Sequence, residues 1–294
     1  MKKTDSKIIK EGISPSLKGK TVAVSGSTGG IGGALCERLV RLGAHIICLD
    51  RNEKKFDRLA SRLKTIDPSA EITYIQMDLE NGESVRCAAE KLVQANIDIL
   101  VLCAGAYHIP RKNTPCGIDN VFQINFVAPY YLATLMKPHI EKRGGRVVAV
   151  GSISQSFTKF DPKNTEKRKS ADAIAYGNAK RCLAFALTRL FEGSDALSIT
   201  HPGISPTGIT AGYPAFIKAV IKLPMKLIFM PPKMAAESVV CGVLTSTPLG
   251  MWIGPRFLGA WGRPRLTSMR GYTAKEADVI VDEAKKFVKM LGGC

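Results

Sequence analysis

Short apolar runs rich in β-branched residues alternate with longer amphipathic stretches along most of the chain. Stretches such as GALCERLVRLG and EKKFDRLASRLKT carry apolar residues three and four positions apart, as amphipathic helices do. Strand-length runs lie at residues 21–25, 45–50, 71–77, 97–103, 146–151, 197–200 and 251–254. Because strands joined by helical crossovers become parallel neighbours, this pattern predicts an α/β fold of the Rossmann type, with one doubly wound parallel sheet of about seven strands in a single domain.

Two segments depart from this rhythm. Residues 1–17 are polar and basic, and we expect a flexible arm that precedes the folded domain at residues 18–294. Residues 207–231 lie in a proline-rich region and include YPAFIKAVIKLPMKLIFM, which mixes apolar side chains with lysines. We expect this segment to cover a hydrophobic substrate pocket, and the alternative is an amphipathic segment in peripheral contact with a membrane.

The composition narrows the class of protein. No apolar run reaches the roughly 18 residues that cross a membrane, and MKKTDSKIIKEG lacks the apolar core of a signal peptide, so we expect a cytoplasmic protein. The eight cysteines show no CxxC or Cys/His ligand spacing, which predicts free thiols and no metal site. The net charge of +17 favours anionic partners, but the basic residues are dispersed and accompany no nucleic-acid-binding motif, so no nucleic-acid partner is expected.

The stretch SGSTGGIGGAL, residues 25–35, stands where the first predicted strand turns into the first helix. Ser25 ends the strand, and Gly26 allows a sharp turn. Gly30 and Gly32, on either side of Ile31, let the backbone approach a ligand closely, and a helix N-terminus presents free N–H groups to a pyrophosphate. The stretch therefore predicts a phosphate-binding loop, and a helix-capping loop is the alternative.

Two carboxylates follow the next strands. Asp50 closes the second strand, where an acidic side chain can accept both ribose hydroxyls of an adenosine, and its alternative is an N-cap for the following helix. Asp50 would repel a 2′-phosphate whereas Arg51 would attract one, and on balance we favour NAD over NADP. Asp78 follows the third strand, where it can bind adenine or cap a helix.

A tyrosine and a lysine, Tyr176 and Lys180, stand four positions apart in a helical pattern and so share one face. An ammonium group near a phenol lowers its pKa, which would let Tyr176 exchange protons near neutrality, as the interconversion of an alcohol and a ketone requires. Ser152 follows the fifth strand, where its hydroxyl can bind a substrate oxygen, and Asn125 interrupts a helical pattern and can face a site. The alternative for the Tyr/Lys pair is an ordinary amphipathic surface.

These motifs together resemble the short-chain dehydrogenase/reductase family, in its non-epimerase branch. SGSTGGIG resembles the family's TGxxxGIG, AYGNAK matches YxxxK, and HPGISPT matches PGxxxT. LCAG resembles NNAG with both asparagines replaced, by Leu102 and Cys103. The resemblance runs from about residue 18 to residue 254 with the motifs in the family's order. The basic loop at 153–172 is longer than is usual in the family, and the tail after residue 254 is similar to that of retinol-dehydrogenase-like members.

The resemblance implies a role for each motif. Tyr176 would be the general acid/base, Lys180 would lower its pKa and bind the nicotinamide ribose, Ser152 would hold the substrate oxygen, and Asn125 would anchor a water for proton relay. The implied cofactor contacts are Gly26, Gly30, Ile31 and Gly32 with Ser25 at the pyrophosphate, Asp50 and Arg51 at the adenosine ribose, Asp78 and Leu79 at the adenine, Ala104 and Gly105 on the adenosine side, and Pro202, Gly203, Ile204 and Thr207 at the nicotinamide and its phosphate.

The expected function is an NAD(P)-dependent oxidoreductase that interconverts a secondary alcohol and a ketone on an apolar small molecule, lipid-like or steroid-like. The resemblance also implies a homo-oligomer, formed through the helices around residues 119–132 and 175–187. One alternative is a non-catalytic nucleotide-binding sensor of the same fold, against which the presence of all four catalytic-type residues argues. The other is a nucleotide-sugar epimerase or dehydratase, which the spacing of Gly30 and Gly32 disfavours.

Overall fold

A computed structural model describes residues 16–204 and 230–293 of the chain. Its centre is an eight-stranded sheet in the order β3-β2-β1-β4-β5-β6-β7-β8. The strands are β1 (Thr21–Ser25), β2 (His45–Asp50), β3 (Ile72–Gln76), β4 (Ile99–Leu102), β5 (Arg146–Val150), β6 (Leu197–Thr200), β7 (Met251–Phe257) and β8 (Trp261–Ser268). The first seven pair in parallel and β8 runs antiparallel to β7. The predicted α/β fold is confirmed, and β8 is a strand that the sequence pattern did not indicate.

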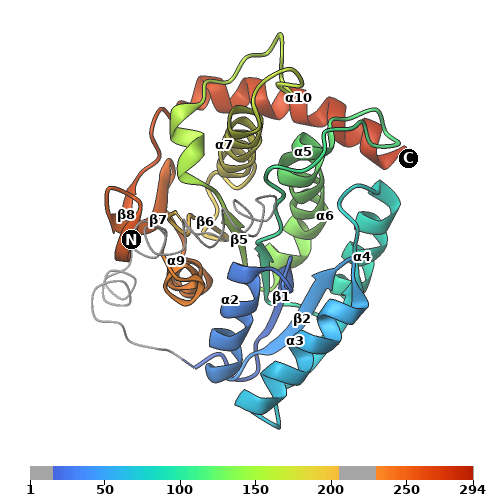
Figure 1. Cartoon of the computed structure of the whole chain (residues 1–294), viewed down its shortest axis with the longest axis vertical. Coiled ribbons are helices and arrows are strands. Elements are labelled where there is room, and N and C mark those ends of the chain that lie inside the picture. Colours follow the sequence, from blue (N-terminus) through green and yellow to red (C-terminus); the bar gives the residue numbers. More distant parts are fainter. Residues whose placement is uncertain (1–15, 205–229, 294) are drawn as a thin grey trace, which may run out of the picture.

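Helices cover both faces of this sheet (Figure 1). One face carries α2 (Gly30–Arg41), α3 (Glu53–Ile66) and α9 (Pro232–Leu244). The other carries α4 (Gly82–Gln94), α6 (Ala128–Lys142) and α7 (Asp172–Leu190), with α10 (Ala274–Gly292) packed outside them. The short elements α5 (Asn120–Phe122) and η1 (Gln123–Val127) lead into α6, and η2 (Ile153–Phe157) follows β5. Every residue of β4 is buried, as expected for a central parallel strand covered on both sides.

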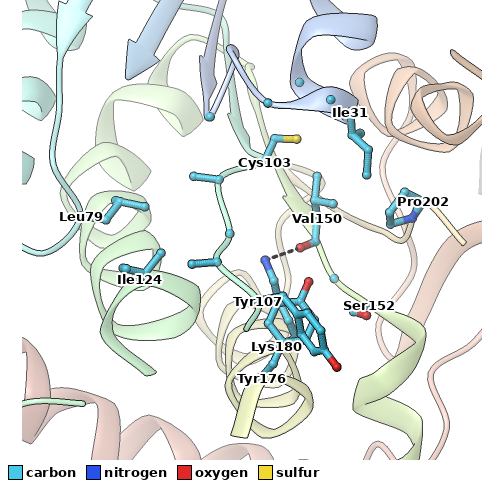
Figure 2. A pocket seen from close by; sticks show the side chains of 18 of the residues that line it. Ile31, Leu79, Cys103, Tyr107, Ile124, Val150, Ser152, Tyr176, Lys180 and Pro202 are labelled. Atoms are coloured by element: carbon cyan, nitrogen blue, oxygen red, sulfur yellow. Dashed lines mark hydrogen bonds between the residues drawn. The ribbon is translucent and has the colours of Figure 1, made fainter. Parts of the chain in front are cut away.

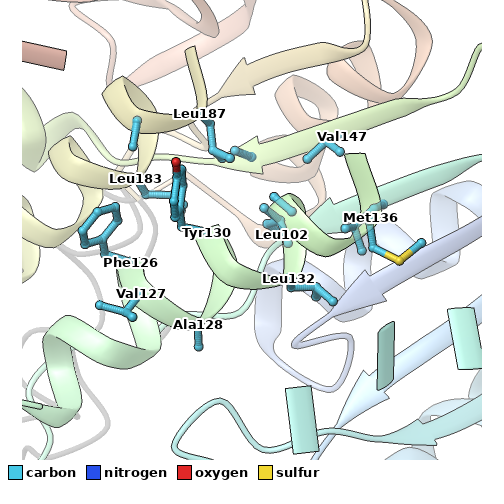
Figure 3. Close-up of a cluster of buried hydrophobic side chains, with 14 of the residues drawn as sticks. Leu102, Phe126, Val127, Ala128, Tyr130, Leu132, Met136, Val147, Leu183 and Leu187 are labelled. Carbon is cyan, nitrogen blue, oxygen red and sulfur yellow. The ribbon is translucent and has the colours of Figure 1, made fainter. Parts of the chain in front are cut away.

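Of the two hydrophobic cores in the described residues, the larger lies between the sheet and helices α6 and α7 (Figure 3). Leu102 of β4 and Val147 of β5 face Leu132 of α6 and the α7 side chains Leu183 and Leu187 in one buried cluster. Burying a leucine side chain fully contributes about 1.5–3 kcal/mol, so this cluster holds α7 firmly against the sheet. The helix that carries Tyr176 and Lys180 is therefore a rigid element.

Helix α10 packs along α7 on its side away from the sheet (Figure 1). The link is polar as well as apolar, because Arg181 Nε donates to Glu276 Oε1 at 2.6 Å and the Arg181 side chain is only 7% exposed. Ala277 and Ile280 of α10 are buried in the same contact region. The chain thus covers with its own helix part of α7, which the family resemblance assigns to subunit contacts.

Both segments that depart from the strand–helix rhythm lie largely outside the described residues, which leave out 1–15, 205–229 and 294. The start of the domain is clear, however, because Leu17 is buried and its N–H donates to the Leu42 carbonyl at 2.7 Å. The predicted arm of residues 1–17 is therefore too long by at least this residue. Within the described part of the chain, none of the helices has the length and apolar character needed to span a membrane.

Candidate active site

A pocket of about 660 Å³ opens at the carboxyl ends of the parallel strands, as expected for this fold (Figure 2). Nearly all of the predicted site residues that the structure describes line it. They are Gly26, Gly30, Ile31, Gly32, Asp50, Arg51, Asp78, Leu79, Ala104, Gly105, Ser152, Tyr176, Lys180, Pro202, Gly203 and Ile204. Thr207 lies outside the described residues, and Ser25 and Asn125 are not part of the lining.

The glycine loop turns tightly between β1 and α2. Gly26 has a φ of +67°, which side chains other than glycine rarely adopt. A Cβ at Gly32 would lie 2.1 Å from the Gly26 carbonyl oxygen, so only glycine allows the loop to close onto the helix. The N-terminus of α2 has no side-chain cap and no acidic residue in its first turn. Free amides and the positive end of the helix dipole fit a phosphate group, so this backbone fits the pyrophosphate of a dinucleotide.

Ser25 does not line the pocket, and its role as a cofactor contact stays a prediction. The side chain is buried, and its hydroxyl donates to the Val101 carbonyl at 3.3 Å. It also accepts from the backbone amides of Cys103 and Ala104, both at 3.1 Å. Ser25 therefore fastens the end of β1 to the segment after β4, where the family resemblance expects polar asparagines and this chain lacks them.

Asp50 lines the pocket beneath the glycine loop and is bound to it. Its carboxylate accepts hydrogen bonds from the Ser27 hydroxyl, from Thr28 Oγ1 at 2.8 Å, and from the Thr28 amide. Burial raises the pKa of Asp50, whereas the hydrogen bonds from Ser27 and Thr28 lower it. The alternative role as an N-cap does not apply, because Asn52 caps α3 by accepting from the Lys55 amide at 2.9 Å.

Asp78 is likewise no helix cap. Asn81 caps α4, with its side chain accepting from the Ser84 amide at 2.8 Å. Asp78 instead accepts from the Glu80 amide at 2.9 Å within the loop after β3, and its own amide donates to the Ser84 hydroxyl. Asparagines therefore cap both helices for which the aspartates were alternative candidates. The two aspartates line the pocket instead.

Lys180 and Tyr176 meet on one face of α7, as their spacing predicts (Figure 2). The Lys180 side chain is buried, its Nζ donates to the Val150 carbonyl at 3.0 Å, and it lies 5.9 Å from the centre of the Tyr176 ring. Burial lowers the pKa of Lys180 to about 8. Burial raises the pKa of Tyr176 to about 12, although a hydrogen bond with Ser152 lowers it.

The sequence predicted a lowered pKa for Tyr176, whereas in the structure this pKa is raised. Tyr176 sits among weakly polar groups, and both Cys103 and Tyr107 raise its pKa further. Lys180 directs its ammonium group to the Val150 carbonyl, so its charge does not offset the cost of burying a phenolate. The phenol is consequently the stable form of Tyr176 at neutral pH, which makes it a proton donor.

Ser152 is oriented by its neighbour Ser154, a residue that the sequence did not single out. The Ser152 oxygen accepts from the Ser154 amide at 3.3 Å and from the Ser154 hydroxyl at 2.8 Å, as the N-cap of η2. A hydroxyl has two acceptor sites and one donor, so these bonds leave its proton free to point elsewhere. Tyr176 lies within reach on the pocket side.

Asn125 is buried in the π-helix η1 and does not line the pocket. Its Oδ1 accepts from the Ala106 amide at 3.1 Å, and its Nδ2 donates to the carbonyls of Ala106 and Val121, both at 2.8 Å. The side chain thus fixes the segment after β4. A Cβ at Gly105 would lie 2.9 Å from Asn125 Oδ1 and 3.3 Å from Lys180 Nζ, so the segment packs tightly against both. Asn125 is a positioning residue here, and its role in water relay stays a prediction.

The end of the pocket around Tyr176 is mainly apolar, and the sequence did not identify its side chains. Tyr107 packs edge-on against Tyr176, with ring centres 5.3 Å apart. Further apolar residues that line the pocket are Ile109, Ile153, Phe157 and Ala173. Most of these apolar residues follow a predicted strand by only a few positions. This location in the sequence is the one feature from which they could have been predicted.

Hydrogen bonds tie the basic loop after β5 to the segment after β4, at residues beyond those that line the pocket. Arg168 donates to Asn113 Oδ1 and to the Gly117 carbonyl, both at 2.6 Å. Glu166 Oε1 accepts from the Asp119 amide at 2.9 Å. The loop therefore uses part of its charge in structural contacts.

The sheet order, with a ligand-sized pocket at the carboxyl ends of its strands, defines the class of Rossmann-type proteins. Comparison with known proteins narrows this class. The short chain dehydrogenase family matches residues 20–161. An uncharacterized oxidoreductase of Schizosaccharomyces pombe is 30% identical over 233 residues, which cover 73% of this chain and 68% of that protein. Retinol dehydrogenase 14 of Homo sapiens is 25% identical over 267 residues, which cover 83% of this chain and 79% of that one.

Solved structures agree at the level of the fold. A structure of an uncharacterized protein from Mycobacterium paratuberculosis has a TM-score of 0.73 at 22% identity and covers 94% of this chain and 95% of that one. An alcohol dehydrogenase from the archaeon Thermococcus sibiricus, complexed with 5-hydroxy-NADP, has a TM-score of 0.57 at 20% identity and covers 76% of this chain and 89% of that one. The chain belongs to the short-chain dehydrogenase/reductase family, and the family makes it an oxidoreductase acting on CH–OH groups.

Proposed function

We propose that this chain is an NAD-dependent oxidoreductase that interconverts a secondary alcohol and a ketone on an apolar substrate. The observation that carries the proposal is the arrangement at the far end of the pocket from Asp50. There the hydroxyls of Tyr176 and Ser152 face each other among apolar side chains, with the Lys180 ammonium buried behind them. A reacting oxygen placed between two hydroxyls in an apolar enclosure can be both held and protonated.

A nicotinamide dinucleotide would supply hydride transfer, and the glycine loop, Asp50 and Pro202 to Ile204 would hold it. Ser152 donates its free proton to the substrate oxygen and orients it. Tyr176, neutral at physiological pH because its pKa is about 12, gives its proton to that oxygen during carbonyl reduction. Alcohol oxidation requires the reverse transfer, in which Tyr176 accepts the proton. Lys180, with a pKa of about 8, is still charged at neutral pH, and its ammonium group is held on the Val150 carbonyl behind the two hydroxyls.

The choice of NAD over NADP rests on Asp50. A buried carboxylate in the pocket wall repels a 2′-phosphate, while its hydrogen bonds to Ser27 and Thr28 hold it in place. Arg51 is exposed next to it and is the feature that would favour NADP. The solved archaeal relative is a complex with an NADP derivative, so the fold itself is compatible with the phosphorylated cofactor.

The apolar substrate is supported by the pocket wall of Tyr107, Ile109, Ile153 and Phe157. The names of sequence relatives point to the same chemistry. They include human polyprenol dehydrogenase, at 25% identity over 213 residues, and a daunorubicin C-13 ketoreductase of Streptomyces, at 25% identity over 254 residues. A lipid-like or steroid-like alcohol fits this wall better than a sugar, which needs polar partners. Homo-oligomer formation and a cytoplasmic location stay predictions.

A substrate panel tests the proposal. Purified protein is assayed with NAD and with NADP against primary and secondary alcohols and their carbonyls, from short chains to retinoid, polyprenoid and steroid compounds, by absorbance of the reduced nicotinamide. We expect turnover of an apolar member and a loss of at least about a hundredfold in Tyr176→Phe, as for removal of a general acid. Turnover that survives this substitution would disprove the mechanism. Dinucleotide binding without turnover of any member would favour a sensor.

A further inference from the structure

The turn between β7 and β8 presents large apolar side chains to solvent. Leu258 is 92% exposed and Phe257 is 72% exposed. Phe157 of η2, which lines the pocket, is 73% exposed. We call these three side chains the apolar tip. Single exposed apolar residues are common, but two adjacent, largely exposed apolar side chains in a turn, with a third exposed one lining the nearby pocket, mark an interaction surface.

Leu258 stands in a backbone conformation that disfavours it. Its φ is +48°, followed by Gly259 at +67°, and the Ala260 amide donates to the Phe257 carbonyl at 2.8 Å. Two successive positive φ angles are typical of the two-residue hairpin turn that prefers Asn-Gly, and a branched apolar residue at such a position is uncommon. Leucine is therefore present although the backbone conformation of this turn disfavours it. Its side chain makes almost no contact with the rest of the protein. Such strain at an exposed position is expected where the side chain has a function outside the fold.

The sequence around the β7–β8 turn is rich in arginine. Residues 251–272 contain Arg256, Arg263, Arg265 and Arg270 and no acidic residue. All four are exposed, and within the described residues none of these guanidinium groups forms an ion pair with a carboxylate. Arg270 lies 5.9 Å from the centre of the Phe157 ring, so charge and apolar surface are interleaved. A partner that fits this surface is apolar in its interior and anionic at its boundary.

The tip adjoins the pocket. A Cβ at Gly259 would lie 3.1 Å from Ile153 Cδ1, and one at Gly203 would lie 2.6 Å from the Ala260 carbonyl oxygen. Ile153 and Gly203 both line the pocket, and Ile153 directly follows Ser152 at the end that contains Tyr176. Whatever binds the tip therefore lies next to the end of the pocket that we assign to the substrate.

We propose that the β7–β8 turn, with Phe157, docks the protein onto an anionic lipid bilayer, so that an apolar substrate enters the pocket from the membrane. This proposal rests on the proposed function in one respect, namely that the molecule entering the pocket is an apolar substrate. Phe257 and Leu258 insert among the acyl chains near the headgroups, and the arginines contact anionic headgroups. The protein then lies on the surface of the membrane without spanning it.

A second copy of this chain fits the surface less well than a bilayer. A symmetric dimer would place the same arginines opposite one another, and residues 251–272 contain no acidic residue to compensate them. The β8 edge is also a poor template for strand pairing, because it contains Pro264 between two arginines. An anionic bilayer neutralises the arginines and removes the apolar tip from water.

The test uses vesicles of phosphatidylcholine, with and without phosphatidylserine, in a sedimentation assay of the full chain. We expect binding that requires phosphatidylserine and weakens as salt is added. Leu258→Asn should reduce the partition coefficient about tenfold, since one buried leucine is lost, while Arg265→Ser should reduce it about fivefold. Because asparagine tolerates the positive φ, Leu258→Asn should also raise Tm, so its loss of binding cannot be attributed to unfolding.

Leu249→Asn is the matched control. Leu249 is 55% exposed and lies just before β7, at the other end of that strand from the turn, and its substitution should leave vesicle binding unchanged. Absence of binding by the wild type, or equal binding by wild type and Leu258→Asn, would overturn the proposal. Dimers in vesicle-free solution that Leu258→Asn dissociates would overturn it in favour of a second copy.

Vesicle sedimentation needs neither substrate nor dinucleotide, so it separates this proposal from the proposed function. Vesicle binding without turnover of any substrate would support the docking surface and contradict the proposed enzymatic function. Turnover without vesicle binding would do the reverse. With a water-soluble short-chain substrate, Leu258→Asn should keep the wild-type kcat/KM, because Leu258 does not line the pocket.

Discussion

Lys180 allows a quantitative test of the burial that the structure assigns to the site. Its side chain is 2% exposed, and burial lowers its pKa from an ordinary value of about 10.5 to about 8. Below both values the group is protonated in the folded and unfolded chains. Between pH 8 and 10.5 the unfolded chain binds the additional proton, so the contribution of Lys180 to the free energy of unfolding rises with pH across this window.

The size of the effect follows from the two pKa values. Relative to pH 7, the wild type should gain about 1.4 kcal/mol of unfolding free energy from Lys180 at pH 9 and about 2.5 kcal/mol at pH 10. Lys180→Met removes the titrating group and keeps most of the side-chain volume. The difference in unfolding free energy between wild type and variant should therefore shift by these amounts in favour of the wild type as pH rises.

The assay is urea denaturation of both proteins at pH 7, 9 and 10. Thiols and phenols that titrate in the same range are common to both proteins and cancel in the difference. Lys91→Met is the control, because Lys91 is exposed on α4, and its difference from the wild type should stay constant with pH. A constant difference for Lys180→Met as well would refute the reasoning that Lys180 is charged in a desolvated site.

Three further substitutions test other parts of the structure. Gly105→Ala would place a Cβ 3.3 Å from Lys180 Nζ and should lower kcat/KM roughly tenfold to a hundredfold, whereas Gly293→Ala, with no atom nearer than 3.5 Å, should leave it unchanged. Burial lowers the pKa of His201 to about 3, so wild type should lose about 2 kcal/mol of unfolding free energy between pH 7 and pH 5, and an equal loss in His201→Gln would contradict this. Asp50→Ala should raise the ratio of kcat/KM with NADP to that with NAD about tenfold, and an unchanged ratio would remove Asp50 from cofactor selection.

The fold could be predicted largely because its strands are buried on both faces. Such strands are continuous apolar runs, and β1, β2 and β6 begin and end at the predicted residues. Strand β8 has no such run, since it is an edge strand with arginines and a proline in its sequence. The turn before it is Leu-Gly and not Asn-Gly, so the usual hairpin signal was absent as well.

The site residues were predicted from strand ends and spacing, which locate a residue but not the direction of its side chain. Ser25 ends β1 as expected, yet its hydroxyl points into the sheet toward Val101. Asn125 lies in the expected helical region, but the π-helix turns its side chain toward Ala106. The direction of the Tyr176 pKa shift was also wrong, because spacing gives the proximity of Lys180 and says nothing of how deeply the pair is buried.

The ties between the loop after β5 and the segment after β4 have a consequence for how such a protein can change over generations. Arg168 and Glu166 join the two segments to each other, at Gly117 and Asp119, so the segments form one unit whose first residues line the pocket. The glycine loop and Asp50 form another unit, held together by Ser27 and Thr28. During evolution the two tied segments could therefore change together, which would change the alcohol that the pocket accepts. The glycine loop with Asp50 could stay the same.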